Sequence, residues 1–226
     1  MSDIPEIYDG PHSSIVGATG SGKSTLAKAM FDAAPGTAIF IDPSGAEMKE
    51  SRADVTIDLS DGDALQPEVF AEARRIRIVP PDGTGTENDF MAMSGLQTLL
   101  FDIGENIPHE NGKFYVFIDE AHEVAPLHAN GDNPVVRMAK RGRSHNVRLF
   151  LISQSPADMS KKAVKQVHYH VVFALNDYSL DYLKRYGMPS EAVENSVDGP
   201  GSYKFVIYDG YDLSGPFRLD EAYVRD

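Results

Sequence analysis

The sequence predicts an α/β fold with a mainly parallel central sheet flanked by helices. Three observations support this prediction: strand-like and helix-like segments alternate, a strand and a helix flank a glycine-rich loop at residues 17–25, and residues 114–118 are all apolar. Alternation of this kind builds parallel sheets, and a strand without polar residues is covered on both faces. We expect a single domain over residues 1–226, with its core at about 12–210 and a polar, peripheral C-terminal tail.

The strands are predicted from short apolar runs that stop at turn residues. Runs rich in β-branched and aromatic residues are typical of buried strands. The segment Asp42–Gly45 and the pair Pro80-Pro81 are the turn signals that stop the second and third runs. In order, the runs lie at residues 13–16, 37–41, 77–79, 114–118, 147–152, 171–175 and 203–208.

The helices are predicted from apolar residues spaced three and four apart. They lie at residues 25–31, at 90–101, after Asn133-Pro134 and at 178–186. Asn is a favoured N-cap, and Pro is favoured at the first helical position. We expect Gly142 to end the third of these helices in the left-handed conformation and Gly187 to end the fourth.

The glycine-rich loop reads GATGSGKST and fits the pattern G-x-x-x-x-G-K-[ST] of a phosphate-binding P-loop. Glycines let its backbone N–H groups face phosphate oxygens, while Lys23 reaches the β- and γ-phosphates and the Ser24 hydroxyl ligates Mg²⁺. The order strand, loop, helix is the one that the motif requires. We therefore expect ATP and Mg²⁺ to bind at Gly17, Ala18, Thr19, Gly20, Ser21, Gly22, Lys23, Ser24 and Thr25.

Asp119 and Glu120 follow the apolar run 114–118, which is the Walker B pattern. Asp119 is expected to hold Mg²⁺, mostly through water. Glu120 is expected to orient and deprotonate the attacking water, which favours hydrolysis over transfer of phosphate to a metabolite. The structural alternative is a pair of acids that cap a helix. His122, two residues later, is interpreted as a packing or capping residue.

Residues 137–148 hold five of the 21 Lys and Arg residues and lead into the strand that ends at Gln154. Cations favour helix C-termini, which accounts for Lys140 and Arg141 but less well for Arg143, beyond Gly142. Gln154 ends a strand beside Asp119, where it is placed to contact the γ-phosphate or the water. The basic segment and Gln154 are thus candidates for the same chemistry.

Together, GATGSGKST, FIDP at 40–43, DE at 119–120, KRGR at 140–143 and SQSP at 153–156 resemble the FtsK/HerA superfamily of DNA-translocating ATPases over roughly residues 12–210. The resemblance implies a RecA-like P-loop (ASCE) ATPase that works as a homo-oligomeric ring, usually a hexamer, on double-stranded DNA of any sequence. It also implies that Arg143, or else Arg141, is an arginine finger on a neighbouring subunit's ATP and that Gln154 is a sensor. Asn146 departs from the family, whose members often carry Gly there.

The segments that flank the motifs indicate which branch of the superfamily the chain resembles. The P-loop begins at residue 17, so we expect no N-terminal barrel of the cellular HerA kind, and we see no membrane segment or winged helix of the FtsK kind. Such a motor is similar to the genome-packaging ATPases of double-stranded DNA viruses with an internal membrane. That implies a virion packaging vertex or the host cytoplasm as its location, with capsid-vertex or membrane proteins as possible partners.

Three features of the sequence bear on alternative functions. The net charge of −13 argues against a protein coated by nucleic acid but permits a local basic site, for which Lys161, Lys162 and Lys165 are candidates unless they form a solvated helix face. A DEAH-class helicase needs a second RecA-like domain, and a transporter ATPase needs an LSGGQ signature, which this chain lacks. A cellular HerA/FtsK-like translocase and an ATP-gated assembly protein without translocase activity remain open.

Overall fold

A computed structural model describes residues 7–8, 10–45, 47–59, 65–80, 87–106 and 112–219 of the chain. The predicted turn beyond Pro80 and the end of the tail, residues 220–226, lie outside these ranges. The strands are β1 (His12–Val16), β2 (Thr37–Ile41), β3 (Val55–Asp58), β4 (Arg75–Val79), β5 (Phe114–Ile118), β6 (Val147–Ser153), β7 (Val167–Val172), β8 (Lys204–Tyr208) and β9 (Leu213–Arg218).

Helices connect most of these strands. They are α2 (Lys23–Ala33), α3 (Pro67–Glu72), α4 (Glu87–Asn106), α5 (Ala121–Val124), α6 (Pro134–Arg141), α7 (Lys161–Val164), α8 (Asp177–Lys184) and α9 (Ser190–Ser196). Three short 3₁₀ segments accompany them, η1 (Glu50–Arg52), η2 (Gly142–His145) and η3 (Pro156–Asp158). Among the described residues, no helix is both long and apolar enough to cross a membrane.

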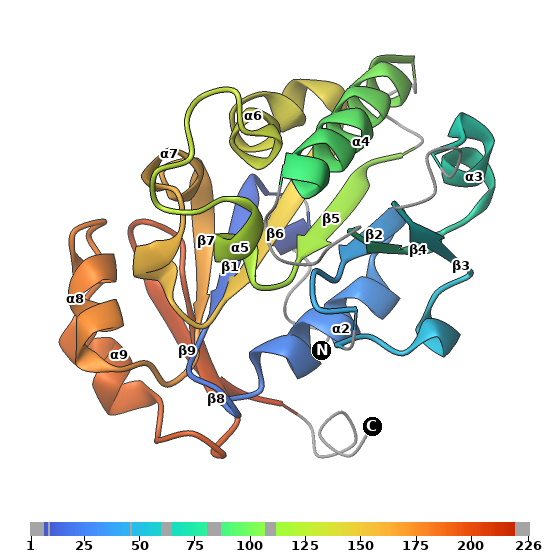
Figure 1. The fold of residues 1–226 in the computed structure, drawn as a ribbon. Coiled ribbons are helices and arrows are strands. Elements are labelled where there is room, and N and C mark those ends of the chain that lie inside the picture. The colour runs from blue at the N-terminus through green and yellow to red at the C-terminus, as the bar shows by residue number, and fades with distance from the viewer. Residues whose placement is uncertain are drawn as a thin grey trace.

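The nine strands form one sheet in the order β3-β4-β2-β5-β6-β1-β7-β8-β9. Strands β1 to β7 pair in parallel, whereas β8 and β9 are antiparallel to their neighbours. The predicted α/β class with a mainly parallel sheet is therefore confirmed. Figure 1 shows the sheet running through the middle of the molecule with helices on both faces.

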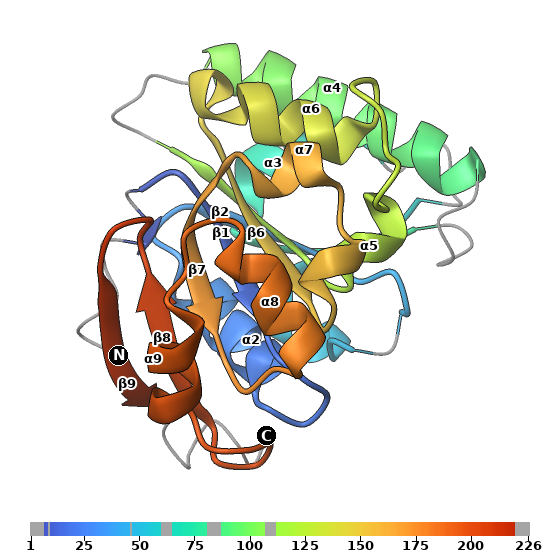
Figure 2. The same ribbon diagram turned by 90° about the vertical axis from the view of Figure 1, so that its left-hand side faces the viewer.

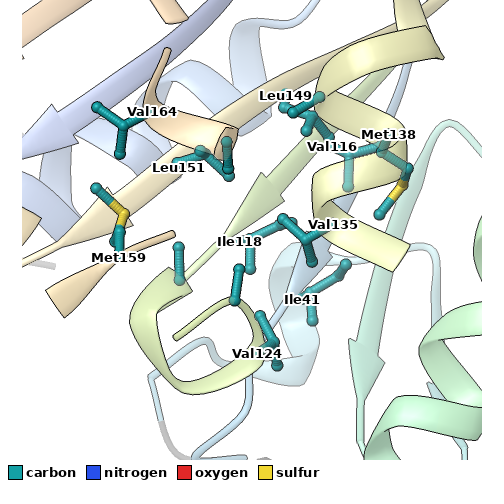
Figure 3. Close-up of a cluster of buried hydrophobic side chains, with 14 of the residues drawn as sticks. Ile41, Val116, Ile118, Val124, Val135, Met138, Leu149, Leu151, Met159 and Val164 are labelled. Carbon is teal, nitrogen blue, oxygen red and sulfur yellow. The ribbon is translucent and has the colours of Figure 1, made fainter. Parts of the chain in front are cut away.

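Alternate side chains of each central strand enter two different cores. On one face, rings of β2, β5 and β6 meet α2; Phe117 and Phe150 stack with centroids 4.4 Å apart. On the other face, aliphatic side chains of the same strands pack under α4, α6 and α7 (Figure 2). Figure 3 shows Ile41 and Ile118, from adjacent strands, beside Val135 of α6. Because both faces are covered, the central strands β2, β5 and β6 are mostly apolar.

The parallel register brings several loops to one edge of the sheet. Ile41 pairs with Ile118, and Val16 at the end of β1 pairs with Ser153 at the end of β6. Parallel strands expose their carboxyl ends at a common edge, which is where open α/β sheets bind ligands. The P-loop, Asp119 and Gln154 therefore leave the sheet side by side.

The left-handed conformation predicted for Gly142 is wrong. Its φ and ψ are −54° and −36°, in the right-handed region, because the chain continues from α6 into η2. The left-handed residue is Asn146, with φ of 59°, at the end of η2. Asn tolerates this conformation better than most residues, so Asn146 meets a backbone requirement that glycine would also meet.

Other differences concern the bounds and number of elements. α2 begins at Lys23 rather than Thr25, so the P-loop's own Lys and Ser lie in its first turn. β7 begins at Val167 and ends at Val172, several residues earlier than predicted, because its polar His residues belong to the strand. The predictions missed β9, which ends at Arg218 where a peripheral tail was expected, and also β3, α3, α5, α7 and α9.

Candidate functional site

The P-loop joins β1 to α2 at the carboxyl edge of the sheet. Its backbone is anchored by hydrogen bonds from Gly17 N to Ser153 O (3.3 Å) and from Ala18 N to Ala174 O (2.8 Å). Gly22 caps α2 with a φ of 105°, which favours glycine. A Cβ on Gly17 would lie 2.6 Å from that of Phe173, so the close approach of these two segments also requires glycine.

Lys23 and Ser24 lie in the first turn of α2, whose backbone N–H groups have no intrahelical acceptors. Those amides, together with the positive end of the helix dipole, make the turn an anion site. The Lys23 side chain is 7% exposed, and its charge stabilises ionised Asp119. The loop therefore presents backbone donors, one ammonium group and one hydroxyl, which is the donor set that a Mg²⁺-bound triphosphate needs.

Asp119 follows β5 directly and is buried, with 4% exposure. Its backbone N–H donates to Ile41 O (3.0 Å), and its Oδ1 accepts from Glu120 N (3.0 Å). Burial raises the pKa of Asp119 to about 7, against the effect of the Glu120 amide, and the charges of Glu47 and Glu120 raise it further. A bound cation favours the ionised carboxylate, so this environment fits a Mg²⁺ ligand.

Glu120 has φ of 39° and ψ of 51°, in the left-handed region. This conformation is uncommon outside glycine and recurs at functional sites. The two oxygens of the Glu120 carboxylate have different surroundings: Oε1 accepts from Gln154 Nε2 at 3.1 Å, whereas Oε2 makes no hydrogen bond with the described residues and lies 3.4 Å from His122 Nδ1. The backbone thus directs this side chain toward the end of β6.

Gln154 immediately follows β6 and links two of the predicted motifs. Its Oε1 accepts a 2.7 Å hydrogen bond from Thr19 Oγ1 of the P-loop, while its Nε2 donates to Glu120. A side chain that contacts both the P-loop and Glu120 is placed to respond to a γ-phosphate. The structure therefore brings together three segments: the P-loop, the pair Asp119 and Glu120 after β5, and Gln154 after β6.

Sequence reasoning missed a buried ion pair beside this site. Asp42, at the end of β2, is fully buried, and its Oδ2 lies 3.0 Å from the Arg77 guanidinium of β4. Asp42 also accepts from the Ser44 hydroxyl (2.9 Å) and from Met48 N (3.1 Å), which shapes the loop after β2. Arg77, a charged residue between the apolar Ile76 and Ile78, was the signal that could have revealed the pair.

That loop carries another residue that the sequence analysis missed. Glu47 forms a 2.8 Å ion pair with Lys28 of α2. Its charge is also the first of the charges that raise the pKa of Asp119. Glu47 therefore adds a third carboxylate to the surroundings of Asp119 and Glu120.

Arg141 and Arg143, the two candidate arginine fingers, lie away from the site around the P-loop. Arg141 ends α6 and Arg143 lies in η2, both exposed and both before the start of β6. The seven residues of β6 span about 20 Å, and Gln154 follows the opposite end of that strand. Neither arginine belongs to the group that surrounds the P-loop of its own chain.

Comparison with known proteins shows which fold this chain shares. No protein-family model matches the chain, and no relative is found among curated proteins. The genome packaging NTPase B204 from Sulfolobus turreted icosahedral virus 2, solved in complex with ATP-gammaS, matches at a TM-score of 0.71 and 19% identity, over 92% of this chain and 98% of that chain. The chain has the fold of the P-loop ATPases.

Two further solved structures share this P-loop ATPase fold. VirB4 of Thermoanaerobacter pseudethanolicus matches at a TM-score of 0.68 and 12% identity, over 95% of this chain and 91% of that chain. EssC (ATPases 2 and 3) from Geobacillus thermodenitrificans matches at 0.55 and 14%, over 92% of this chain and 39% of that chain. The predicted resemblance to FtsK/HerA-type ATPases is thereby confirmed at the level of the fold.

Proposed function

We propose that this protein hydrolyses ATP and couples hydrolysis to the translocation of double-stranded DNA, as the motor that packages a viral genome. The observation that carries the proposal is the hydrogen-bonded chain from Thr19 through Gln154 to Glu120, next to Asp119. A phosphate-binding loop that is connected to an acid–base residue fits hydrolysis better than simple nucleotide binding. The fold shared with the genome packaging NTPase B204 supports packaging as the use of the energy.

The roles of the residues follow from their positions. The P-loop amides and Lys23 would hold the phosphates, and Ser24 and Asp119 would hold Mg²⁺, which would supply positive charge to the triphosphate. Glu120 accepts the proton of the water that attacks the γ-phosphorus. Gln154 aligns that water and transmits the state of the site to the chain beyond β6.

The place of the arginines supports a ring of subunits. Arg141 and Arg143 lie at the opposite end of β6 from their own P-loop, so an arginine finger formed by either of them would act on the site of a neighbouring copy. A finger of this kind contributes about 10³–10⁵ in rate. We propose Arg143 for this role, with Arg141 as the alternative, in a homo-oligomeric ring of six subunits.

DNA contacts are proposed at α7. Lys161 and Lys162 in this helix and Lys165 just after it are exposed, and they follow Gln154 by only seven to eleven residues. A shift of the segment after β6 would move these ammonium groups along the phosphate backbone. Such contacts carry no sequence information and weaken with salt. We place the motor at the packaging vertex of the virion or in the host cytoplasm, docked on capsid-vertex or membrane proteins.

The test is the ATPase rate of the assembled protein with and without duplex DNA of random sequence. We expect Mg²⁺-dependent hydrolysis that duplex DNA stimulates at low salt, in a ring whose mass is measured by light scattering. Glu120→Gln is the control and should bind ATP but lose most of its turnover, about 10²–10⁴-fold, so that a residual rate is left to measure in single-turnover assays. Hydrolysis that DNA does not change in a proven ring would overturn translocation and favour an ATP-gated assembly protein.

A further inference from the structure

His122 lies in the single turn of α5, two residues beyond Glu120. Its Nδ1 is 3.4 Å from Glu120 Oε2 and 3.3 Å from the hydroxyl of Ser153, the last residue of β6. The imidazole therefore bridges the Walker B carboxylate and the strand that carries Gln154. A residue that merely packed or capped a helix would not need to face either group.

The surroundings of Glu120 Oε2 indicate which way the bridge works. This oxygen is buried, and within the described part of the chain it makes no hydrogen bond shorter than 3.5 Å. His122 Nδ1, 3.4 Å away, lies beside it and can carry a proton. Because a buried carboxylate oxygen without a donor is costly, a proton on Nδ1 directed at Oε2 is the favourable arrangement.

The far side of the bridge is fixed by the backbone. Ser153 Oγ accepts a 3.0 Å hydrogen bond from Ser155 N, so the hydroxyl beside His122 is held in place. Ser153 is fully buried and belongs to a central strand. The imidazole is thereby oriented by a rigid element, as expected of a group that positions another.

We propose that His122 is a positioning residue that orients Glu120 for the attack of water on ATP. This inference rests on the proposed ATPase function. Gln154 donates to Oε1, and His122, which is hydrogen-bonded to Ser153, lies beside Oε2, so both oxygens face groups connected to the end of β6. Of these two neighbours of Glu120, it is Gln154 that also accepts a hydrogen bond from Thr19 of the P-loop. If a γ-phosphate draws Gln154 away from Glu120, the His122 contact keeps the Glu120 carboxylate directed at the attacking water.

The kinetic test compares His122→Ala with His122→Asn in the full-length ring. Removing the bridge should lower kcat about tenfold, a fraction of the 10²–10⁴ that a positioned acid–base group contributes. The Kd of a fluorescent ATP analogue should stay within about twofold. Asn places an amide N–H close to the position of Nδ1 and should restore most of the rate. An unchanged kcat in His122→Ala, or a loss that Asn does not reduce in a folded variant, overturns the proposal.

A double-mutant cycle separates positioning from a general structural defect. In the Glu120→Gln background, measured in single-turnover assays with excess protein, His122→Ala should cause no further loss. A full additional tenfold loss would show that His122 acts independently of Glu120. Wild-type protein without measurable hydrolysis would refute the proposed function instead, and the contact itself is then decided by the spectroscopic test.

The spectroscopic test uses the protein without nucleotide. Long-range ¹H–¹⁵N spectra report the tautomer and surroundings of each imidazole. We expect a protonated Nδ1 at His122 whose resonance shifts in Glu120→Gln. Glu123→Gln, an exposed carboxylate in the same turn, is the matched control and should leave it unchanged. Equal responses to the two variants, or no response to Glu120→Gln, would rule out the contact.

Discussion

Thr19 donates a 2.7 Å hydrogen bond to Gln154, so the P-loop and the end of β6 are directly connected. Gln154 in turn donates to Glu120 at 3.1 Å. A side chain in this position can report the presence of a phosphate to the acid–base residue and to the segment that follows β6. In the proposed mechanism, this relationship would connect nucleotide binding, hydrolysis and movement through one residue.

Changing Gln154 should therefore affect turnover more than binding. Gln154→Glu keeps the size of the side chain but places a second carboxylate beside Glu120, and like charges at hydrogen-bond distance repel strongly. We expect kcat to fall about 10²-fold or more, while the Kd for a fluorescent ATP analogue changes only a few-fold. Thr19→Val is the matched variant, because it removes the link to the P-loop but leaves Gln154 on Glu120; its loss of kcat should be smaller. Equal losses in kcat for the two variants would contradict the prediction that the contact between Gln154 and Glu120 matters more than the link to Thr19.

The proposed arginine finger predicts complementation between subunits. Lys23→Ala subunits should lack triphosphate binding, and Arg143→Ala subunits should lack the group that completes a neighbour's site. A mixed ring contains interfaces where an intact Lys23 meets an intact Arg143, so mixing should recover part of the ATPase rate. The measurement is the rate as a function of mixing ratio, with co-assembly verified by affinity capture of one tagged variant. No recovery at any ratio in co-assembled rings would exclude Arg143, and the same series with Arg141→Ala tests the alternative.

The buried pair Asp42–Arg77 should matter for stability because its two charges are shielded from water. Removing one partner leaves the other buried and uncompensated, which typically costs about 3–5 kcal/mol of unfolding free energy. We expect Asp42→Asn to show a loss of this order in urea denaturation. Asp198→Asn breaks the pair with Lys204, in which Asp198 is 67% exposed, and should change stability by less than about 1 kcal/mol. Similar losses for the two variants would show that burial of Asp42 is not what makes its pair important.

The sequence predicted the parts of the site that are local in the chain. The P-loop spacing, the acids after the apolar run 114–118 and Gln154 after β6 are each visible within a few residues, and parallel strand order then places them at one edge. Contacts between distant segments were not predictable in this way. His122 meets Ser153, 31 residues later, and Asp42 meets Arg77, 35 residues later, because of strand pairing and loop shape.

Errors in the fold have local physical causes. β7 was placed too late because only the apolar run 171–175 was taken as the strand, whereas β7 also contains polar residues such as His170, which is buried and bonded to Ser14. Helices of four residues, such as α5 and α7, are too short to show a helical period. Gly142 was expected to end the helix, but the 3₁₀ segment η2 continues the helical turns, and Asn146 follows it as the C-cap.

Stability should fall in acid because His170 is buried in its neutral form. Burial, with a smaller effect from His168, lowers the pKa of His170 to about 4, from an ordinary value of 6.5. Between these values the unfolded chain binds a proton that the folded protein does not, so unfolding is favoured as the pH falls from about 6.5 to 4. The difference corresponds to about 3 kcal/mol for this residue, present in full above pH 6.5 and lost below pH 4.

His170→Asn tests this dependence, because Asn keeps a polar partner for the Ser14 hydroxyl, 2.8 Å from His170 Nδ1, but does not titrate. We expect unfolding free energies of the variant, from urea denaturation at pH 4 to 7.5, to decline less steeply on acidification than those of the wild type, by about one proton. His12, whose pKa burial and Arg148 lower to about 4, remains in both proteins and contributes equally to each curve. His128→Asn, at an exposed position, should reproduce the wild-type curve. A His170→Asn curve parallel to that of the wild type would mean that the buried imidazole is not the group that makes the fold sensitive to acid.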